Sequence, residues 1–217
     1  MAVVIGLRCA DGIVVCANQQ MSGPGASKSY ERKLTIEPSQ SILLAYSGLP
    51  SLAREARQKI REKIGQAEIP SSLLYLAANE VLTDMRRQYV DLDLQLLIGI
   101  SPASEEPTLF KFDGNGLHVA DEFNFLGVGD SCLLRFLAAM MHSLQLNLEE
   151  IANLAIYLVR KAEGYIEPCD GPIGTAIMKS GDQSCRLLLE EDVQDIIRKV
   201  EEREGALIPL IARGASF

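Results

Sequence analysis

The sequence is poor in the residues and segments that would place it in several large classes of protein. It has two histidines, in different predicted elements, and five cysteines without Cys-x-x-Cys spacing, so we expect neither a metal site nor another cofactor. No apolar run reaches the roughly 18 residues of a membrane-spanning helix, and no leader of the secretory type stands at the start. Without an export signal, an odd number of cysteines favours reduced thiols and a cytoplasmic location.

Basic charge is also scarce, because 21 Lys and Arg stand against 29 Asp and Glu, and the formal net charge is −8. An acidic chain repels polyphosphates and anionic headgroups, so we expect neither nucleic acid nor a membrane as a partner. The mean hydropathy of +0.10 is slightly high for a monomer and favours buried subunit interfaces. No repeat, linker or low-complexity segment interrupts the 217 residues, so we expect one domain over 1–217.

The first 20 residues are typical of a β-hairpin whose first strand lies at the very start of the chain. Apolar runs over 2–7 and 13–17 flank a turn at 9–12. Asp11-Gly12 between β-branched segments is a strong hairpin signal, because glycine tolerates positive φ. Continuous apolar runs of this length suit strands covered on both faces, so we expect the first residue to be held in the core region of a sheet.

The rest of the chain alternates blocks of strands with pairs of helices. After a loop at 21–29, we expect strands over 33–37, 41–47, 94–100, 109–112, 117–120, 122–127, 173–179 and 185–189. We expect helices over 51–64 (N-cap Ser51, C-cap Gly65), 71–90, 131–146, 148–163 (after an Asn147–Glu150 capping box, ended by Gly164) and 191–202, with an apolar tail at 207–211. Strands in blocks favour antiparallel sheets, and paired helices favour a helical layer outside each sheet. The predicted fold class is therefore α+β, a four-layer αββα sandwich with two stacked antiparallel sheets.

The first two predicted helices carry distinct faces. In the first, Leu52, Ala53, Ala56, Ile60 and Ile64 form an apolar stripe. We expect its five basic residues to form a solvated face rather than a site for an acidic partner: Arg54, Arg57, Lys59, Arg61 and Lys63. In the second, one face holds Leu73, Leu76, Ala77, Val81 and Met85 together with Glu80 and Asp84. Leu74, Ala78 and Leu82 widen the apolar side, which predicts a helix buried on two sides.

Three stretches carry a resemblance to a known family: VVIGLRCADGIVVCANQQ, RKLTIEP and LLAYSGLPSLAREAR. Together with the glycine-rich helix opening at Gly127 and the late Gly-Pro-Ile strand, they resemble proteasome-type subunits of the N-terminal-nucleophile hydrolase superfamily. The likeness covers nearly the whole chain, element for element. It implies the same αββα sandwich. The chain lacks the extra N-terminal helix of proteasome α subunits, so it is more similar to the β type.

The resemblance implies a specific chemistry. In the family, the hydroxyl of an N-terminal residue, usually Thr, is the nucleophile, and its own α-amine is the base. A buried Lys lowers the proton affinity nearby, and an Asp at the end of the second strand orients it. A Ser and an Asp/Ser pair in later loops complete the network, and a backbone N–H after the first break donates to the oxyanion.

Only part of this set matches the present chain. Lys33 falls on the Lys position and Gly48 on the oxyanion donor. Ala2 falls on the nucleophile position, or Met1 if the register slips, and neither has a hydroxyl or a thiol. Asn18 replaces the orienting Asp and carries no charge. The loop positions are also replaced: Val128 and Asp130 stand at the two Ser of the glycine-rich turn, Ile166 or Glu167 at the Asp, Cys169 at the Ser and Asp170 at the following Gly.

Three functions stay open on this basis. The first is a non-catalytic or divergent subunit of a self-compartmentalising assembly linked to proteolysis, as a homo-oligomer or with other proteasome-like subunits. The second is an active peptidase or amide hydrolase that uses the N-terminal amine or Cys169, a thiol that Lys33 would activate. The third is a module that binds a peptide or a small ligand. Lys33 is read either as a catalytic lysine or, preferably, as a remnant paired with Asp170 or Glu167, because a buried Lys needs a partner.

Overall fold

The computed structural model describes residues 3–22, 28–37, 41–65, 69–120, 122–128, 131–165, 171–181 and 185–212, and for 20–22, 28–29 and 205–212 it describes the backbone only. The strands are β1 (Val3–Cys9), β2 (Gly12–Asn18), β3 (Gln20–Ser22), β4 (Lys28–Tyr30), β5 (Leu34–Glu37), β6 (Ile42–Gly48), β7 (Leu94–Ile100), β8 (Thr108–Phe112), β9 (Leu117–Val119), β10 (Phe123–Gly127), β11 (Ile173–Lys179) and β12 (Cys185–Leu187). The helices are α1 (Pro50–Ile64), α2 (Ser71–Gln88), α3 (Cys132–Met141), α4 (Leu148–Tyr165) and α5 (Glu190–Ala212).

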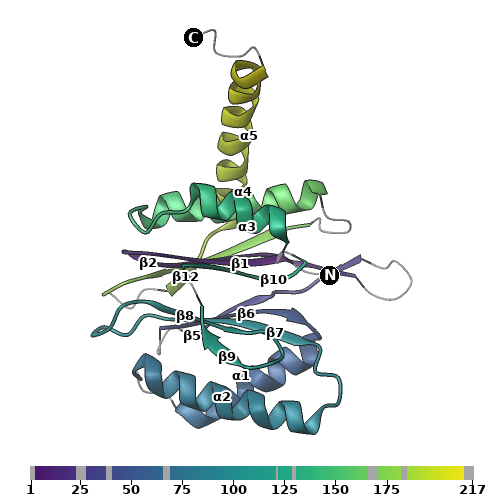
Figure 1. The fold of residues 1–217 in the computed structure, drawn as a ribbon, viewed down its shortest axis with the longest axis vertical. Coiled ribbons are helices and arrows are strands. Elements are labelled where there is room, and N and C mark those ends of the chain that lie inside the picture. The colour runs from purple at the N-terminus through teal and green to yellow at the C-terminus, as the bar shows by residue number, and fades with distance from the viewer. Residues whose placement is uncertain are drawn as a thin grey trace.

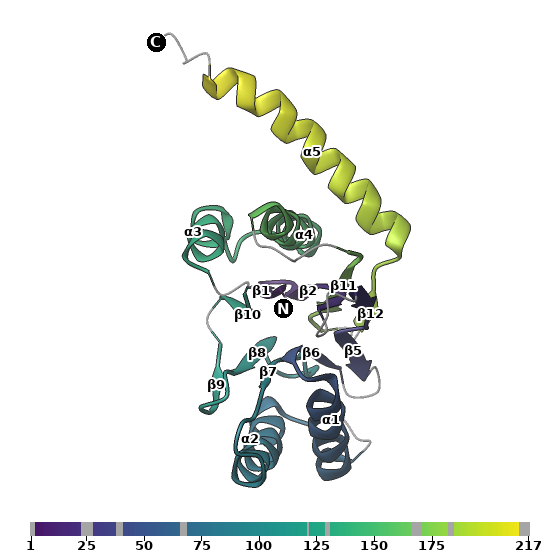
Figure 2. The same ribbon diagram turned by 90° about the vertical axis from the view of Figure 1, so that its right-hand side faces the viewer.

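Two sheets lie face to face, and helices cover the outer face of each (Figure 1). One sheet has the order β10-β1-β2-β11-β12 and lies under α3 and α4, and the other has the order β5-β6-β7-β8-β9 and lies against α1 and α2 (Figure 2). Every strand pairing in them is antiparallel. The predicted α+β class and its four-layer αββα arrangement are confirmed.

Buried side chains of the first hairpin alternate between two core layers. Ile5, Leu7 and Val14 pack in the layer beneath α3 and α4. Val4 and Val15 pack in the layer between the two sheets. A third layer lies between the second sheet and the helices α1 and α2. Strands covered on both faces are what the continuous apolar runs of this hairpin predict.

Two local predictions are confirmed at atomic detail. Gly12 closes the first hairpin at φ +150, where a Cβ would lie 2.0 Å from the backbone O of Met178. Asn147 Oδ1 accepts from the N–H groups of Glu149 and Glu150, each at 3.0 Å, while Glu150 Oε2 accepts from the N–H of Asn147 at 2.9 Å. This reciprocal pair is the capping box that the sequence indicates.

Several element ends differ from the prediction. Leu49, not Ser51, is the N-cap of α1, because Pro50 takes the first helical position, where its fixed φ fits and its missing N–H costs nothing. The ends of the predicted loop at 21–29 form the ribbon β3–β4. Helix α3 ends at Met141 rather than at 146, and α4 continues through Gly164 to Tyr165. The predicted tail at 207–211 is part of the helix α5.

The helical faces also need correction. In α2 the buried stripe is Leu74, Ala77, Ala78, Val81, Leu82 and Met85, and Leu73 and Leu76 are exposed. The buried residues form a single stripe, whose centre lies about one position further along the chain than the predicted face. The predicted burial of α2 on two sides is therefore wrong, because one side of the helix is exposed. The basic residues of α1, by contrast, lie on an exposed or half-exposed face as predicted, and two of them make ion pairs there, Arg54 with Glu31 and Arg57 with Glu37.

Helix α5 leaves the edge of the first sheet after β12, crosses α4 and extends beyond the other layers (Figure 2). Its Glu201 and Glu204 pair with Arg160 and Lys161 near the end of α4. These pairs attach the middle of the long helix to α4.

Candidate functional site

The end of β2 lies beside the start of β1, where the resemblance places the nucleophile. Val4 pairs with Ala17, and Val3 pairs on its other side with Gly127 of β10. By the same antiparallel register, Asn18 lies opposite Val3. Ala2 itself lies outside the described residues. The strands that flank the start of β1, which are β2 and β10, are both described.

Lys33 is fixed at the same end of the sheets. Its side chain is 1% exposed and is among the largest fully buried ones in the described residues. Its backbone N–H donates to Oε1 of Gln19 at 2.8 Å, and its backbone O accepts from the N–H of Tyr46 at 3.2 Å. These two bonds join Lys33 to the end of β2 and to β6. A buried ammonium is retained only where other groups compensate its charge.

Gly48 ends β6 directly before α1. It has φ +108, and a Cβ there would lie 2.2 Å from the backbone O of Asp93. The same Asp93 oxygen accepts from the N–H of Leu49 at 2.9 Å. Only glycine fits this conformation and this approach. The positive end of the α1 dipole follows at once, which favours negative charge at this position.

Asn18 is fully buried, and its Nδ2 donates to Oε1 of Glu163 in the last turn of α4, at 3.4 Å. Glu163 and Gln19 are the residues of the site that the sequence did not indicate. Each contacts a predicted site residue through a side chain, across 145 and 14 positions of the sequence respectively. No spacing in the sequence signals either contact.

Three of the seven predicted site residues are described: Asn18, Lys33 and Gly48. The backbone of Lys33 is bonded to Gln19, next to Asn18, and to Tyr46 of β6, the strand that Gly48 ends. The other four, Ala2, Asp130, Cys169 and Asp170, lie outside the described residues, as do Met1, Ile166 and Glu167. Their roles stay predictions. Val128 is described, and it packs against the core layer beneath α3 and α4.

A cleft of about 460 Å³ lies next to Lys33, between β5, β6 and α1. Apolar walls from Leu34, Ile36 and Ala53 meet the ion pairs Glu31–Arg54 and Glu37–Arg57. Tyr46 also lines it. Burial, and next the negative charge of Glu31, raise the pKa of the Tyr46 hydroxyl, which therefore stays protonated. The hydroxyl oxygen is itself buried and lies close to Glu31, so the polar groups that the cleft offers are those of the two ion pairs, within an otherwise largely apolar lining.

The described thiols near the core are poor nucleophiles. Burial raises the pKa of Cys16 and of Cys185 to about 12 and also raises that of Cys9. A thiol that stays protonated is not activated. In the described ranges, no three His, Cys, Asp or Glu side chains are grouped to hold a metal ion. His142, for example, instead contacts the backbone O of Arg8 through Nε2, at 2.8 Å.

Comparison with known proteins gives the family. The family model described as "Proteasome subunit" matches residues 2–167. This chain belongs to the proteasome subunit family. Proteasome family members typically assemble into oligomers. A comparison with curated protein sequences gives no match.

Solved structures agree with this membership at the level of the fold. Anbu (Gly-1) mutant from Hyphomicrobium sp. strain MC1 aligns at a TM-score of 0.82 and 14% identity over 100% of this chain and 99% of its own. Anbu (ancestral beta-subunit) from Yersinia bercovieri gives 0.81 and 14%, over 99% and 98%. A second Anbu structure from the same Hyphomicrobium strain gives 0.78 and 15%, over 99% of both chains. None of the helices in the described ranges combines the length and the apolar character of a membrane span.

Proposed function

We propose that this proteasome-family chain is a non-catalytic or divergent subunit of a self-compartmentalising assembly linked to proteolysis in the cytoplasm. The proposal rests on a contrast. The family's fold is present, and the residue that the resemblance places at the nucleophile position, Ala2, has no hydroxyl or thiol.

One observation carries it: no hydroxyl or thiol is available at the start of β1. The aligned residue is Ala2, and the first Ser, Thr or Cys in the sequence is Cys9. Cys9 lies at the other end of β1, about 20 Å away at roughly 3.3 Å per residue. It is also buried, and its raised pKa keeps it protonated. A nucleophile of the family's kind is therefore missing where the α-amine would serve it as base.

An exposed apolar stripe on α3 supports assembly with a second copy. Leu133, Phe136 and Met140 follow one another at spacings of three and four and are 44%, 61% and 68% exposed. Large apolar side chains that gather on one exposed face mark protein–protein contacts. Copies with a net charge of −8 repel each other, and an uncharged stripe gives them a surface on which to meet.

Light scattering coupled to size exclusion tests the assembly. We expect a mass several times that of the 23.7 kDa chain. Phe136→Glu should reduce it to a monomer, while Leu189→Glu, which also charges an exposed apolar position but not on α3, should not. A clean monomer for the unmodified protein would remove the support for assembly with itself, and a stable mass only with a second proteasome-like subunit would indicate a mixed assembly.

The cleft beside Lys33 favours a second candidate, binding of a peptide or a small ligand without turnover. Its apolar walls and the charged side chains of the ion pairs Glu31–Arg54 and Glu37–Arg57 suit a side chain with an apolar body and a polar tip. Calorimetry with a peptide library tests this candidate. Binding that Arg54→Ala weakens would support it, because Arg54 is an exposed polar residue of the lining, and the absence of any heat of binding would count against it.

A further inference from the structure

Glu163 lies against the end of β2, far from it in sequence. Its side chain is 6% exposed. Its Oε1 accepts from Nδ2 of Asn18 at 3.4 Å, and its Oε2 accepts from a terminal guanidinium nitrogen of Arg160 at 3.0 Å. The carboxylate is thus held between β2 and α4 by one neutral and one charged donor, and the charged bond is the stronger of the two.

This contact decides which end of the Asn18 amide faces α4. An ionised carboxylate can only accept, so the NH2 group of Asn18 faces Glu163 and Oδ1 faces the other way. Asn18 stands opposite Val3, next to Gln19, which holds Lys33. Ammonium groups donate and never accept. A fixed amide therefore presents one acceptor oxygen, as a carboxylate would, at the end of β2 where the sequence has lost the charge.

We infer that Glu163 is a positioning residue of the candidate site around Asn18 and Lys33. Its carboxylate orients the Asn18 amide and supplies from α4 the negative charge that position 18 lacks. This goes beyond the proposed function, because it concerns how the site is built and holds for a catalytic or a non-catalytic subunit. The fold thereby keeps an acidic group near the site on a different element.

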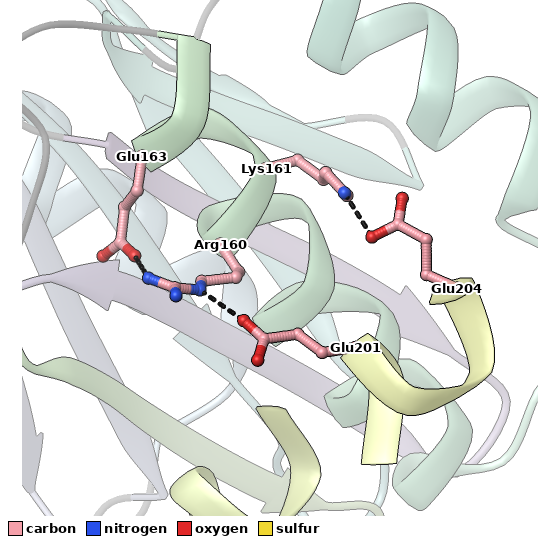
Figure 3. Close-up of polar contacts among 5 residues, drawn as sticks. All are labelled: Arg160, Lys161, Glu163, Glu201 and Glu204. Carbon is pink, nitrogen blue, oxygen red and sulfur yellow. Dashed lines mark hydrogen bonds and ion pairs between the residues drawn. The ribbon is translucent and has the colours of Figure 1, made fainter. Parts of the chain in front are cut away.

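Arg160 ties this pair to α5. Its Nε donates to Oε1 of Glu201 at 3.0 Å while it also holds Glu163 (Figure 3). Among the groups that face Glu163 are Asn18 and the Cys16 thiol on β2 and Arg160 on its own helix, and the side chains of Lys161, Glu201 and Glu204 line the same surface. After burial and the bond from Thr175, the Glu163 charge is the next influence on the pKa of Cys16, and it raises that pKa. The Cys16 thiol on β2 thus lies within the electrostatic influence of Glu163.

The test returns the carboxylate to position 18. Asn18→Asp alone places two carboxylates at contact distance, so the Tm at neutral pH should fall by about 4–8 °C. Adding Glu163→Gln leaves one carboxylate, now at position 18, and one amide, now at position 163. The double variant should therefore regain most of the lost Tm. If the two changes instead add, so that the double variant is as unstable as the sum of the singles, the inference is wrong.

A matched control separates this exchange from the burial of any charge. Asn124 is a buried asparagine in β10, and its Oδ1 accepts from the N–H of Phe125. Asn124→Asp should destabilise the protein too, but Glu163→Gln should not rescue it. Rescue of both variants alike would show a general effect of removing one negative charge and would overturn the inference.

A second measurement keeps the inference falsifiable if Asn18→Asp does not fold. The side-chain amide signals of Asn18, identified by their loss in Asn18→Ser, should move as Glu163 is titrated with acid. In Glu163→Gln that movement should stop. Signals that do not respond to acid in the unmodified protein would contradict the contact on which the inference rests.

Discussion

The backbone N–H of Lys33 donates to Oε1 of Gln19 at 2.8 Å, so a side chain at the end of β2 holds the main chain that carries the buried lysine. The same Gln19 side chain lies against Gly174 of β11, where a Cβ would approach Nε2 to 1.9 Å. The position of Lys33 therefore depends on the absence of a side chain at residue 174.

Gln19→Ala should lower the free energy of unfolding by about 1–2 kcal/mol, because it leaves the part-buried N–H of Lys33 without its acceptor. Gly174→Ala should cost a similar amount by displacing Gln19. Because both changes break the same bond, the double variant should cost clearly less than their sum in urea unfolding. Gln58→Ala, which removes an exposed amide paired with Glu62, is the control and should be close to neutral. Additive costs would show that Gly174 acts on something other than Gln19.

Gly48→Ala should destabilise the protein by about 2–4 kcal/mol, because it combines positive φ with a backbone clash against Asp93. Gly114→Ala is the matched control. Gly114 also has positive φ, +90, but nothing lies within 4 Å of its added Cβ. It should cost only about 1–2 kcal/mol from the backbone conformation. Equal losses for the two variants would mean that the approach to Asp93 does not constrain β6.

Stability should decline at alkaline pH through the buried thiols. The pKa of Cys16 is raised from 9.0 to about 12, so the folded protein favours the protonated thiol. That contribution is complete below about pH 9 and is lost as the pH rises toward 12, because the unfolded state then releases a proton that the folded state keeps. The fall in Tm above about pH 9 should be shallower in Cys16→Ala than in the unmodified protein. The exposed Cys132 should react with iodoacetamide while the buried Cys16 does not. An equally steep fall of Tm with pH in Cys16→Ala and in the unmodified protein would contradict this account.

The ion pairs between α4 and α5 should contribute little at high salt. Glu201→Gln with Glu204→Gln should cost about 0.5–1.5 kcal/mol in dilute buffer and clearly less in about 0.5 M NaCl, because these side chains are 30–50% exposed. The double variant should also speed proteolysis within α5. Asp195→Asn, which removes the pairs with Arg198 and Lys199 inside α5, should leave proteolysis unchanged. Equal proteolysis in all three proteins would show that the pairs do not attach α5 to α4.

Two largely buried strands were predicted closely from the sequence. The strands β7 and β11 have the predicted bounds, because mostly apolar segments between turn residues mark strands covered on both faces. The face of α2 was misplaced because Leu73 and Leu76 are apolar and exposed, and a sequence does not say which apolar stripe meets a sheet. The N-cap of α1 was misplaced by two positions because Pro50 competes with Ser51 for the helix start.

The candidate site was predictable in part for a physical reason. Lys33 and Gly48 keep residue types that their surroundings require, a compensated buried cation and a glycine at positive φ. Gln19 and Glu163 act through side-chain contacts between segments that only the folded sheets bring together. Hydrogen bonds of this kind leave no periodicity and no spacing in the sequence, so no motif reveals them.

The most direct test of the central claim is peptide hydrolysis by the purified full chain, measured with a panel of fluorogenic peptides. The account predicts no turnover above that of buffer, because Ala2, which it places at the nucleophile position, has no hydroxyl or thiol. Turnover that is lost in Lys33→Ala or in Cys169→Ala would contradict it and would establish a hydrolase with a different nucleophile.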